Sequence, residues 1–290
     1  MRAYLRSFAA ALAVMVCMPF MIQGQGQQSA ATPAQPTPRL ADGTPNLGRV
    51  PGEKGVWNVP YIQNMADYAS GRSVGPAGRA GGGGNEGGRG GSRSEPHIPF
   101  QPWAAAVYDY NSANVSKYDP EGYCLPPGGP RMMATPYPME IIQLPEQRRI
   151  FMVFEGATHI WREIYMDGRA HPRGDALNPT YLGHSVGRWD GDTLVIDVVG
   201  FNEGTWIDYY GHPHTDLLHV VERISRPDKR TLRYEATIDD PGAYTKAWTV
   251  SWTLPWNPTG ELAEYICQEN NRYLWNLTDD HGQPIFGPQR

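Results

Sequence analysis

The sequence predicts a mainly β protein whose strands form an antiparallel meander that closes into a lipocalin-like barrel. Short apolar or alternating runs recur throughout residues 139–267. Turn residues such as Asp-Gly and Pro-Asp separate these runs, and no helical periodicity lies between them. Strands joined by short turns pair as hairpins, and the resulting sheet either closes on itself or folds into two layers. A β-sandwich is therefore the alternative fold.

Nine runs carry the strand pattern. They are Met139–Leu144, Ile150–Glu155, His159–Met166, His184–Trp189, Thr193–Gly200, Leu217–Ser225, Thr231–Ile238, Trp248–Leu254 and Leu262–Cys267. We expect the barrel to span residues 139–277 and a C-terminal tail to follow at 278–290.

The first 26 residues have the composition of a signal peptide. Arg2 and Arg6 precede an apolar run of about 15 residues, which is shorter than the roughly 20 residues that a membrane-spanning helix needs. Cleavage between Gly24 and Ala31 would release a periplasmic or secreted protein that keeps no membrane anchor.

Three segments precede the predicted barrel. Residues 27–70 are polar and proline-rich and predict an extended arm, with a short helix near Tyr61–Tyr68. Residues 71–95 are rich in glycine and arginine and have almost nothing to bury, which predicts a disordered loop. Residues 96–138 are expected to pack on the barrel as a helix, near Pro102–Val115, and a loop.

Charge and cysteine content limit the classes of partner and of covalent structure. The formal net charge is −5, so we expect no general attraction to nucleic acid. Outside the signal peptide the chain has two cysteines, Cys124 and Cys267. They either pair, as is common in exported proteins, or remain buried thiols.

The segment HSVGRWDGDTLVID predicts an oriented base. If Asp190-Gly191 is a two-residue hairpin loop, His184 lies directly opposite Asp197, with Arg188 on the same face of the sheet. Directly opposite Cβ atoms are about 5 Å apart, so the carboxylate could orient the imidazole for general-base catalysis. The alternative is a solvent-facing polar pair.

Glu222 interrupts an otherwise apolar strand face formed with Leu218, Val220 and Ile224. A carboxylate that points inward must be paired, or its pKa rises, and such residues are often functional. Glu222 is therefore a candidate second acid or base. The alternative is a purely structural pair with a buried arginine, for example Arg162 or Arg188.

His212 and His214 flank Pro213 in a His-x-His turn, within the stretch YYGHPHTDLLHVVERIS. In an extended segment both imidazoles share one side and could chelate a divalent metal, with His219 or Asp216 as a third ligand. The alternative is that these histidines only form the turn, and no cofactor is then expected.

Aromatic residues predict a small-molecule pocket. Trp161 and Tyr165 share one strand face, as do Trp248 and Trp252, and such a lining with a few polar groups is typical of ligand sites. Arg131, in the loop CLPPGGPR, could reach an anionic ligand. The alternative is that the aromatic residues form core and the loop packs over a barrel end.

Several long motifs resemble a family of secreted proteins found in environmental bacteria. They include CLPPGGPR, GHSVGRWDGDTLVID, GHPHTDLLHVVER and DDPGAYTKAWTV. The resemblance implies relatedness and export, and it brings no established activity or catalytic residues.

These observations predict an exported barrel that binds a small apolar or aromatic molecule. Acid–base catalysis, as a lyase, isomerase or hydrolase, would use His184 with Asp197 as the base and Glu222 as a second acid or base. Arg188 would stabilise a developing anion. The alternatives are a carrier without turnover and a metal-binding protein built on the His-x-His turn.

Overall fold

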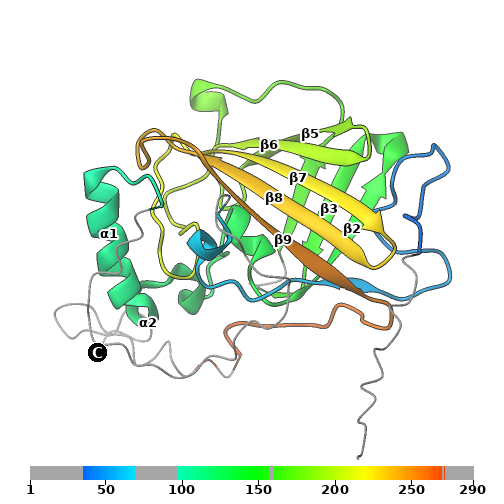
Figure 1. Cartoon of the computed structure of the whole chain (residues 1–290), viewed down its shortest axis with the longest axis horizontal. Helices are drawn as coiled ribbons and strands as arrows, with labels where there is room; N and C mark the ends of the chain where they lie inside the picture. The colour runs from blue at the N-terminus through cyan, green and yellow to red at the C-terminus, as the bar shows by residue number, and fades with distance from the viewer. Residues whose placement is uncertain (1–34, 70–96, 157–159, 270, 272–290) are drawn as a thin grey trace, which may run out of the picture. The chain divides into compact units, whose positions relative to one another are not determined.

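The computed structural model describes residues 35–69, 97–156, 160–269 and 271. Nine strands of the described chain form one closed barrel (Figure 1), which confirms the predicted mainly β barrel fold. The predicted signal peptide, the glycine- and arginine-rich loop at 71–95 and the tail at 278–290 lie outside the described residues.

Each strand pairs with the next along the chain, and β9 pairs with β1. The strands are β1 (Val56–Asn58), β2 (Pro138–Leu144), β3 (Arg149–Phe154), β4 (Trp161–Tyr165), β5 (His184–Asp190), β6 (Thr193–Val199), β7 (His219–Asp228), β8 (Thr231–Asp239) and β9 (Trp248–Asn257).

The strand that closes the barrel comes from the N-terminal arm. Trp57 of β1 pairs with Met139 of β2 on one side and with Trp256 of β9 on the other. The strand expected at Leu262–Cys267 is absent, and that prediction was wrong. Its residues are half-buried or exposed, so the segment has no inward face with which to join the wall.

Short helices lie between the strands, most of them between β1 and β2. The α-helices are α1 (Pro102–Ala113) and α2 (Val115–Tyr118), and the 3-10 helices are η1 (Met65–Tyr68), η2 (Pro120–Tyr123), η3 (Pro130–Met133), η4 (Pro145–Gln147) and η5 (Gly174–Ala176). α1 covers most of the helix expected near Pro102–Val115, whereas the helix expected near Tyr61–Tyr68 is only the 3-10 turn η1. α1 lies outside the barrel (Figure 1), where the Trp103 indole donates to the Gly242 carbonyl at 2.8 Å.

One strand pair departs from the predicted antiparallel meander. β4 and β5 run parallel, and only two residue pairs join them, Ile164 with Ser185 and Tyr165 with Val186. Parallel neighbours cannot be connected by a tight turn. The chain therefore crosses from β4 back to the start of β5 through residues 166–183, which run outside the wall (Figure 1).

The inside of the barrel is filled by side chains. Inward residues such as Leu194, Ile224, Leu232 and Val250 have no exposed surface. The centre of the barrel is therefore packed core rather than an open lumen. No helix among the described residues is both long and apolar enough to cross a membrane.

Candidate functional site

A cleft of about 500 Å³ opens where the wall between β4 and β5 is weakest. The strands diverge beyond their two paired residues, and the β4–β5 connection forms the other side of the opening. The lining residues are Pro126, Ile160, Trp161, Arg162, Glu163, Tyr165, Pro172, Ala176, Leu177, Asn178, Thr180, Tyr181, Leu182, Gly183, His184 and Ser185. The cleft thus combines apolar and aromatic walls with a few charged groups, which is the usual composition of a small-molecule site.

Arg162 joins this cleft to a buried polar network inside the barrel. Arg162 is 5% exposed, and its Nη2 donates to Oε2 of Glu222 at 2.5 Å. Its Nε donates to Oγ of Ser185 at 2.9 Å, and the Tyr234 hydroxyl donates to the other oxygen of Glu222 at 2.7 Å. Glu222, 1% exposed, is therefore the inward carboxylate that the strand pattern predicts, and Arg162 is its partner.

Burial and the neighbouring Glu222 carboxylate raise the pKa of Tyr234 well above its ordinary value. Both effects disfavour a tyrosinate inside the barrel. Tyr234 therefore stays a neutral donor, and Glu222 is held by two donors at once. This arrangement leaves Glu222 in a structural pair rather than free as a second acid or base.

The β5–β6 hairpin has a different register from the one predicted. The turn residues are Gly191 and Asp192, so Val186 lies opposite Asp197 and His184 lies opposite Val199. Gly191 adopts a φ of +58°, and a left-handed first turn position favours glycine over the aspartate of the predicted loop. His184 and Asp197 still share a face, but they are diagonal neighbours.

His171, from the β4–β5 connection, fills the space between these two residues. Its Nδ1 lies 2.8 Å from Nδ1 of His184, and its Nε2 lies 2.9 Å from Oδ1 of Asp197. His219, at the start of β7, approaches the same Asp197 oxygen at 3.1 Å. The predicted pair is thus a chain of side chains, His184–His171–Asp197, with His219 beside it.

The hydrogen bonds fix the protonation pattern of this chain. The Asp197 carboxylate can only accept, so Nε2 of His171 carries a proton, and Nδ1 of a neutral His171 must accept. Nδ1 of His184 is then the donor, which leaves Nε2 of His184 with a free lone pair. That nitrogen has no hydrogen-bond partner within the described ranges.

Burial lowers the pKa of His184, and the positive charge of Arg169, and of His171 whenever that ring is protonated, lowers it further. The His184 ring also stacks on the Tyr165 ring, with centroids 5.3 Å apart. The Arg169 guanidinium lies over the same Tyr165 ring, 3.7 Å from its centroid. His184 is therefore neutral at pH 7 and held in one orientation, as a general base requires.

Arg188 lies on the outer face of β5 and is exposed. It does not line the cleft, so the structure does not place it beside a reacting group. Arg188 shares the outer face of β5 with His184 but lies four residues further along the strand, so no contact here supports its predicted role beside His184.

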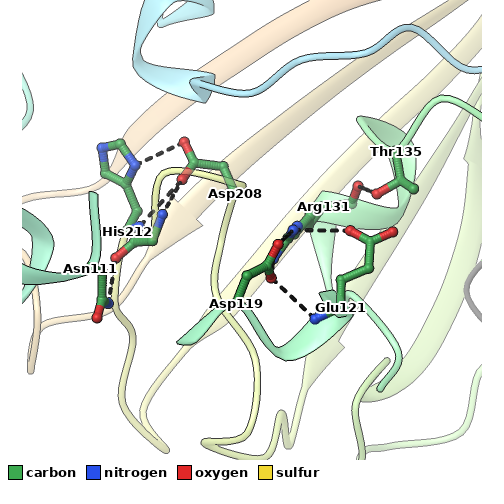
Figure 2. A network of polar contacts seen from close by, with 8 residues as sticks. Asn111, Asp119, Glu121, Arg131, Thr135, Asp208 and His212 are labelled. Carbon is green, nitrogen blue, oxygen red and sulfur yellow. Dashed lines mark hydrogen bonds and ion pairs between the residues drawn. The ribbon is translucent and has the colours of Figure 1, made fainter. Parts of the chain in front are cut away.

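The two histidines of the His-x-His turn bind different partners. Nδ1 of His212 lies 2.8 Å from the Asp208 carboxylate, which also accepts from the backbone amide of Gly211 (Figure 2). His212 is fully buried and stacks on Phe100. His214 instead contacts the Thr205 hydroxyl at 2.9 Å. The two imidazoles do not converge, and the described residues contain no group of three or more His, Cys, Asp or Glu side chains arranged to hold a metal ion.

Arg131 is paired with two carboxylates at the end of α2 and in η2, just before its own loop. Its two Nη atoms donate to both oxygens of Asp119 at 2.7 and 2.8 Å, and Nη2 also pairs with Glu121 at 2.9 Å (Figure 2). The side chain is 3% exposed. The guanidinium is thus buried and paired with two carboxylates, so no contact here supports the predicted role of Arg131 in binding a ligand.

The four predicted aromatic ligand residues separate into two pairs. Trp161 and Tyr165 line the cleft. Trp248 and Trp252 are buried core residues instead, and the Trp252 indole donates to the Met133 carbonyl at 2.8 Å. Strand alternation alone cannot distinguish these pairs. It shows which residues share a face of the sheet, but not whether that face lines a cleft or packs in the core.

Comparison of the chain with models of known families, with curated proteins and with solved structures gave no match. The function is therefore argued from the geometry of the cleft.

Proposed function

We propose that the cleft between β4 and β5 binds a small, largely aromatic molecule, and that His184 acts on it as a general base. The observation that carries this proposal is the placement of a neutral, oriented imidazole in the wall of an apolar cleft. Trp161 and Tyr181 offer flat surfaces for an aromatic ring, and Ile160 and Leu182 supply apolar area. A carrier without turnover remains the alternative.

His171 and Asp197 support the catalytic form of this proposal. When Nε2 of His184 takes a proton, the imidazolium donates through Nδ1 to His171, and Asp197 holds His171 in the required tautomer. This is the arrangement of a base that is oriented by a second and a third group. His171 and Asp197 are positioning residues in this scheme.

Binding is tested with 2-acetylnaphthalene as a neutral aromatic probe in saturation-transfer NMR. Ala176 lines the cleft and is exposed, so Ala176→Trp should fill the opening and abolish transfer. Ala113→Trp, at the exposed end of α1, is the matched control and should bind like the wild type. Equal binding by both variants would place the probe elsewhere and refute the site.

Catalysis is tested with 5-nitrobenzisoxazole, which needs only a base to react. The base removes the ring C–H proton, the electrons of that bond form a nitrile, and the N–O bond breaks to release a coloured phenolate. We expect His184→Gln to lower the rate by about 100-fold and Arg188→Gln to leave it unchanged. Binding of 2-acetylnaphthalene without a rate above that of free imidazole would favour the carrier.

We also propose that the protein is exported. The first 26 residues support this proposal, because they begin with basic residues and continue as an apolar run. The disulfide between Cys124 and Cys267 also supports it, because such bonds are typical of oxidising compartments. Mass spectrometry of the cellular protein should find a mature terminus between Gly24 and Ala31. A processed protein that retains Met1 would refute export by this signal.

A further inference from the structure

The Arg162 side chain is almost wholly buried, but one of its guanidinium nitrogens makes no hydrogen bond to the described protein. Nε is bonded to Ser185 and Nη2 to Glu222, whereas Nη1 has no hydrogen-bond partner in the described part of the chain. The residue lines the cleft from its floor. Nη1 is not among the buried polar atoms that lack a partner, so it reaches the space of the cleft, where a polar atom of the bound molecule can accept from it in place of water.

We infer that the molecule bound in the cleft presents a neutral oxygen acceptor, such as the carbonyl of an aromatic ketone, ester or amide, to Nη1 of Arg162. This inference rests on the proposed aromatic-binding function and names the substrate class of the same site. The aromatic part would lie against Trp161 and Tyr181, and the carbonyl would point toward the barrel wall.

The charges around the cleft favour a neutral acceptor over a carboxylate. The charge of Arg162 is already matched by Glu222 at 2.5 Å. Glu163 also lines the cleft, and its own partner, Arg149, lies 3.1 Å away. An anionic ligand would bring a further negative charge beside two carboxylates, whereas a carbonyl accepts from Nη1 without adding charge.

The geometry also gives the anchored oxygen a role in the proposed chemistry. Removal of a proton from a carbon next to a carbonyl moves negative charge onto the oxygen, and a fixed cationic donor stabilises that charge. Arg162 would then hold the oxygen while His184, in the same cleft, takes the proton. The proton moves to Nε2, the C–H electrons form the enolate double bond, and no other reactant is needed.

Three shape-matched probes test the anchor: 2-ethylnaphthalene, 2-acetylnaphthalene and 2-naphthoate. We expect the wild type to bind the acetyl compound about fivefold more tightly than the ethyl compound, the effect of one hydrogen bond. Naphthoate should bind more weakly than the acetyl compound. The Nε–H NMR signal of Arg162 should move with the acetyl probe and stay in place with the ethyl probe.

Two variants separate the donor from the charge. Arg162→Gln with Glu222→Gln keeps the floor neutral and should remove the preference for the acetyl probe. Glu222→Gln alone leaves Arg162 unmatched and should shift preference toward naphthoate. Equal binding of the ethyl and acetyl probes by the wild type would overturn the anchor while leaving the proposed function intact. If none of the three probes binds, both proposals fall.

Discussion

At the scale of single residues, the cleft depends on groups whose state is set by their neighbours. His184 is neutral because it is half-buried and close to the positive charge of Arg169, and its hydrogen-bonded neighbours His171 and Asp197 determine which of its nitrogens has the free lone pair. Arg162 is buried because Glu222 and Ser185 accept from it. Changing a neighbour should therefore alter the behaviour of a group that is itself unchanged.

The pKa of His184 should fall below 6.5 in an NMR pH titration. His171→Gln should raise it, because a glutamine cannot take up a proton and so cannot place a positive charge beside the His184 imidazolium, although burial should still hold the pKa below 6.5. Arg188→Gln, an exposed change on the same strand, is the control and should leave the titration in place. A midpoint at or above 6.5 in the wild type would contradict this account. The proton-transfer rate should follow the same titration, present above the midpoint and lost below it.

Glu222→Ala should destabilise the fold by about 3–5 kcal/mol, because it leaves the buried Arg162 charge and the Tyr234 hydroxyl without their acceptor. Denaturant unfolding measures the loss. Glu235→Ala, an exposed change on the neighbouring β8, should stay within about 0.5 kcal/mol of the wild type. Equal effects would show that the buried pair is not a structural unit.

At the scale of elements, strand alternation predicts eight of the nine described strands, and their edges agree to within a few residues. β1 could not be predicted, because three residues are too few to show an alternating pattern. The closing of the barrel by the N-terminal arm is therefore seen only in the structure. The parallel pairing of β4 with β5 could not be predicted for a related reason. The crossover at 166–183 has no periodic pattern that separates it from a long hairpin loop.

The candidate site was predictable to the same extent. Trp161, Tyr165 and His184 lie on regular strands, so their faces follow from alternation. His171 lies in the crossover, where no register places it, and Arg162 is visible only as a possible partner for Glu222. The residues that complete the site come from tertiary packing, which local sequence does not encode.

Gly55, directly before β1, tests the importance of closing the barrel. It has a φ of +150°, and a Cβ atom there would overlap the Trp256 ring of β9. Gly52 has a φ of +84° and open space around it. Backbone strain should lower the free energy of unfolding of both alanine variants by about 1 kcal/mol. Overpacking against Trp256 should lower that of Gly55→Ala by about a further 1–3 kcal/mol. Thermal unfolding compares them, and equal midpoints would mean that β1 is not tightly held against β9.

At the scale of the whole molecule, one covalent bond ties the segment after β9 to the helical region before β2. Cys124 and Cys267 form a disulfide with Cα atoms 5.6 Å apart and a sequence separation of 143 residues. The loop that it closes contains strands β2–β9, so the bond limits the unfolded chain over most of the barrel. The same bond holds the start of the CLPPGGPR loop, whose Pro126 lines the cleft.

Removing the disulfide should therefore affect both stability and binding. In the Cys124→Ser/Cys267→Ser variant we expect the free energy of unfolding to fall by about 2–5 kcal/mol, because the unfolded chain regains the freedom that the cross-link removes. Binding of 2-acetylnaphthalene should weaken as well, because the wall that carries Pro126 is no longer tethered. Guanidinium unfolding of the wild type with and without reductant measures the first effect, and the serine variant, which should not respond to reductant, is the control. A wild type whose unfolding midpoint is the same in both conditions would show that closing this long loop does not stabilise the barrel.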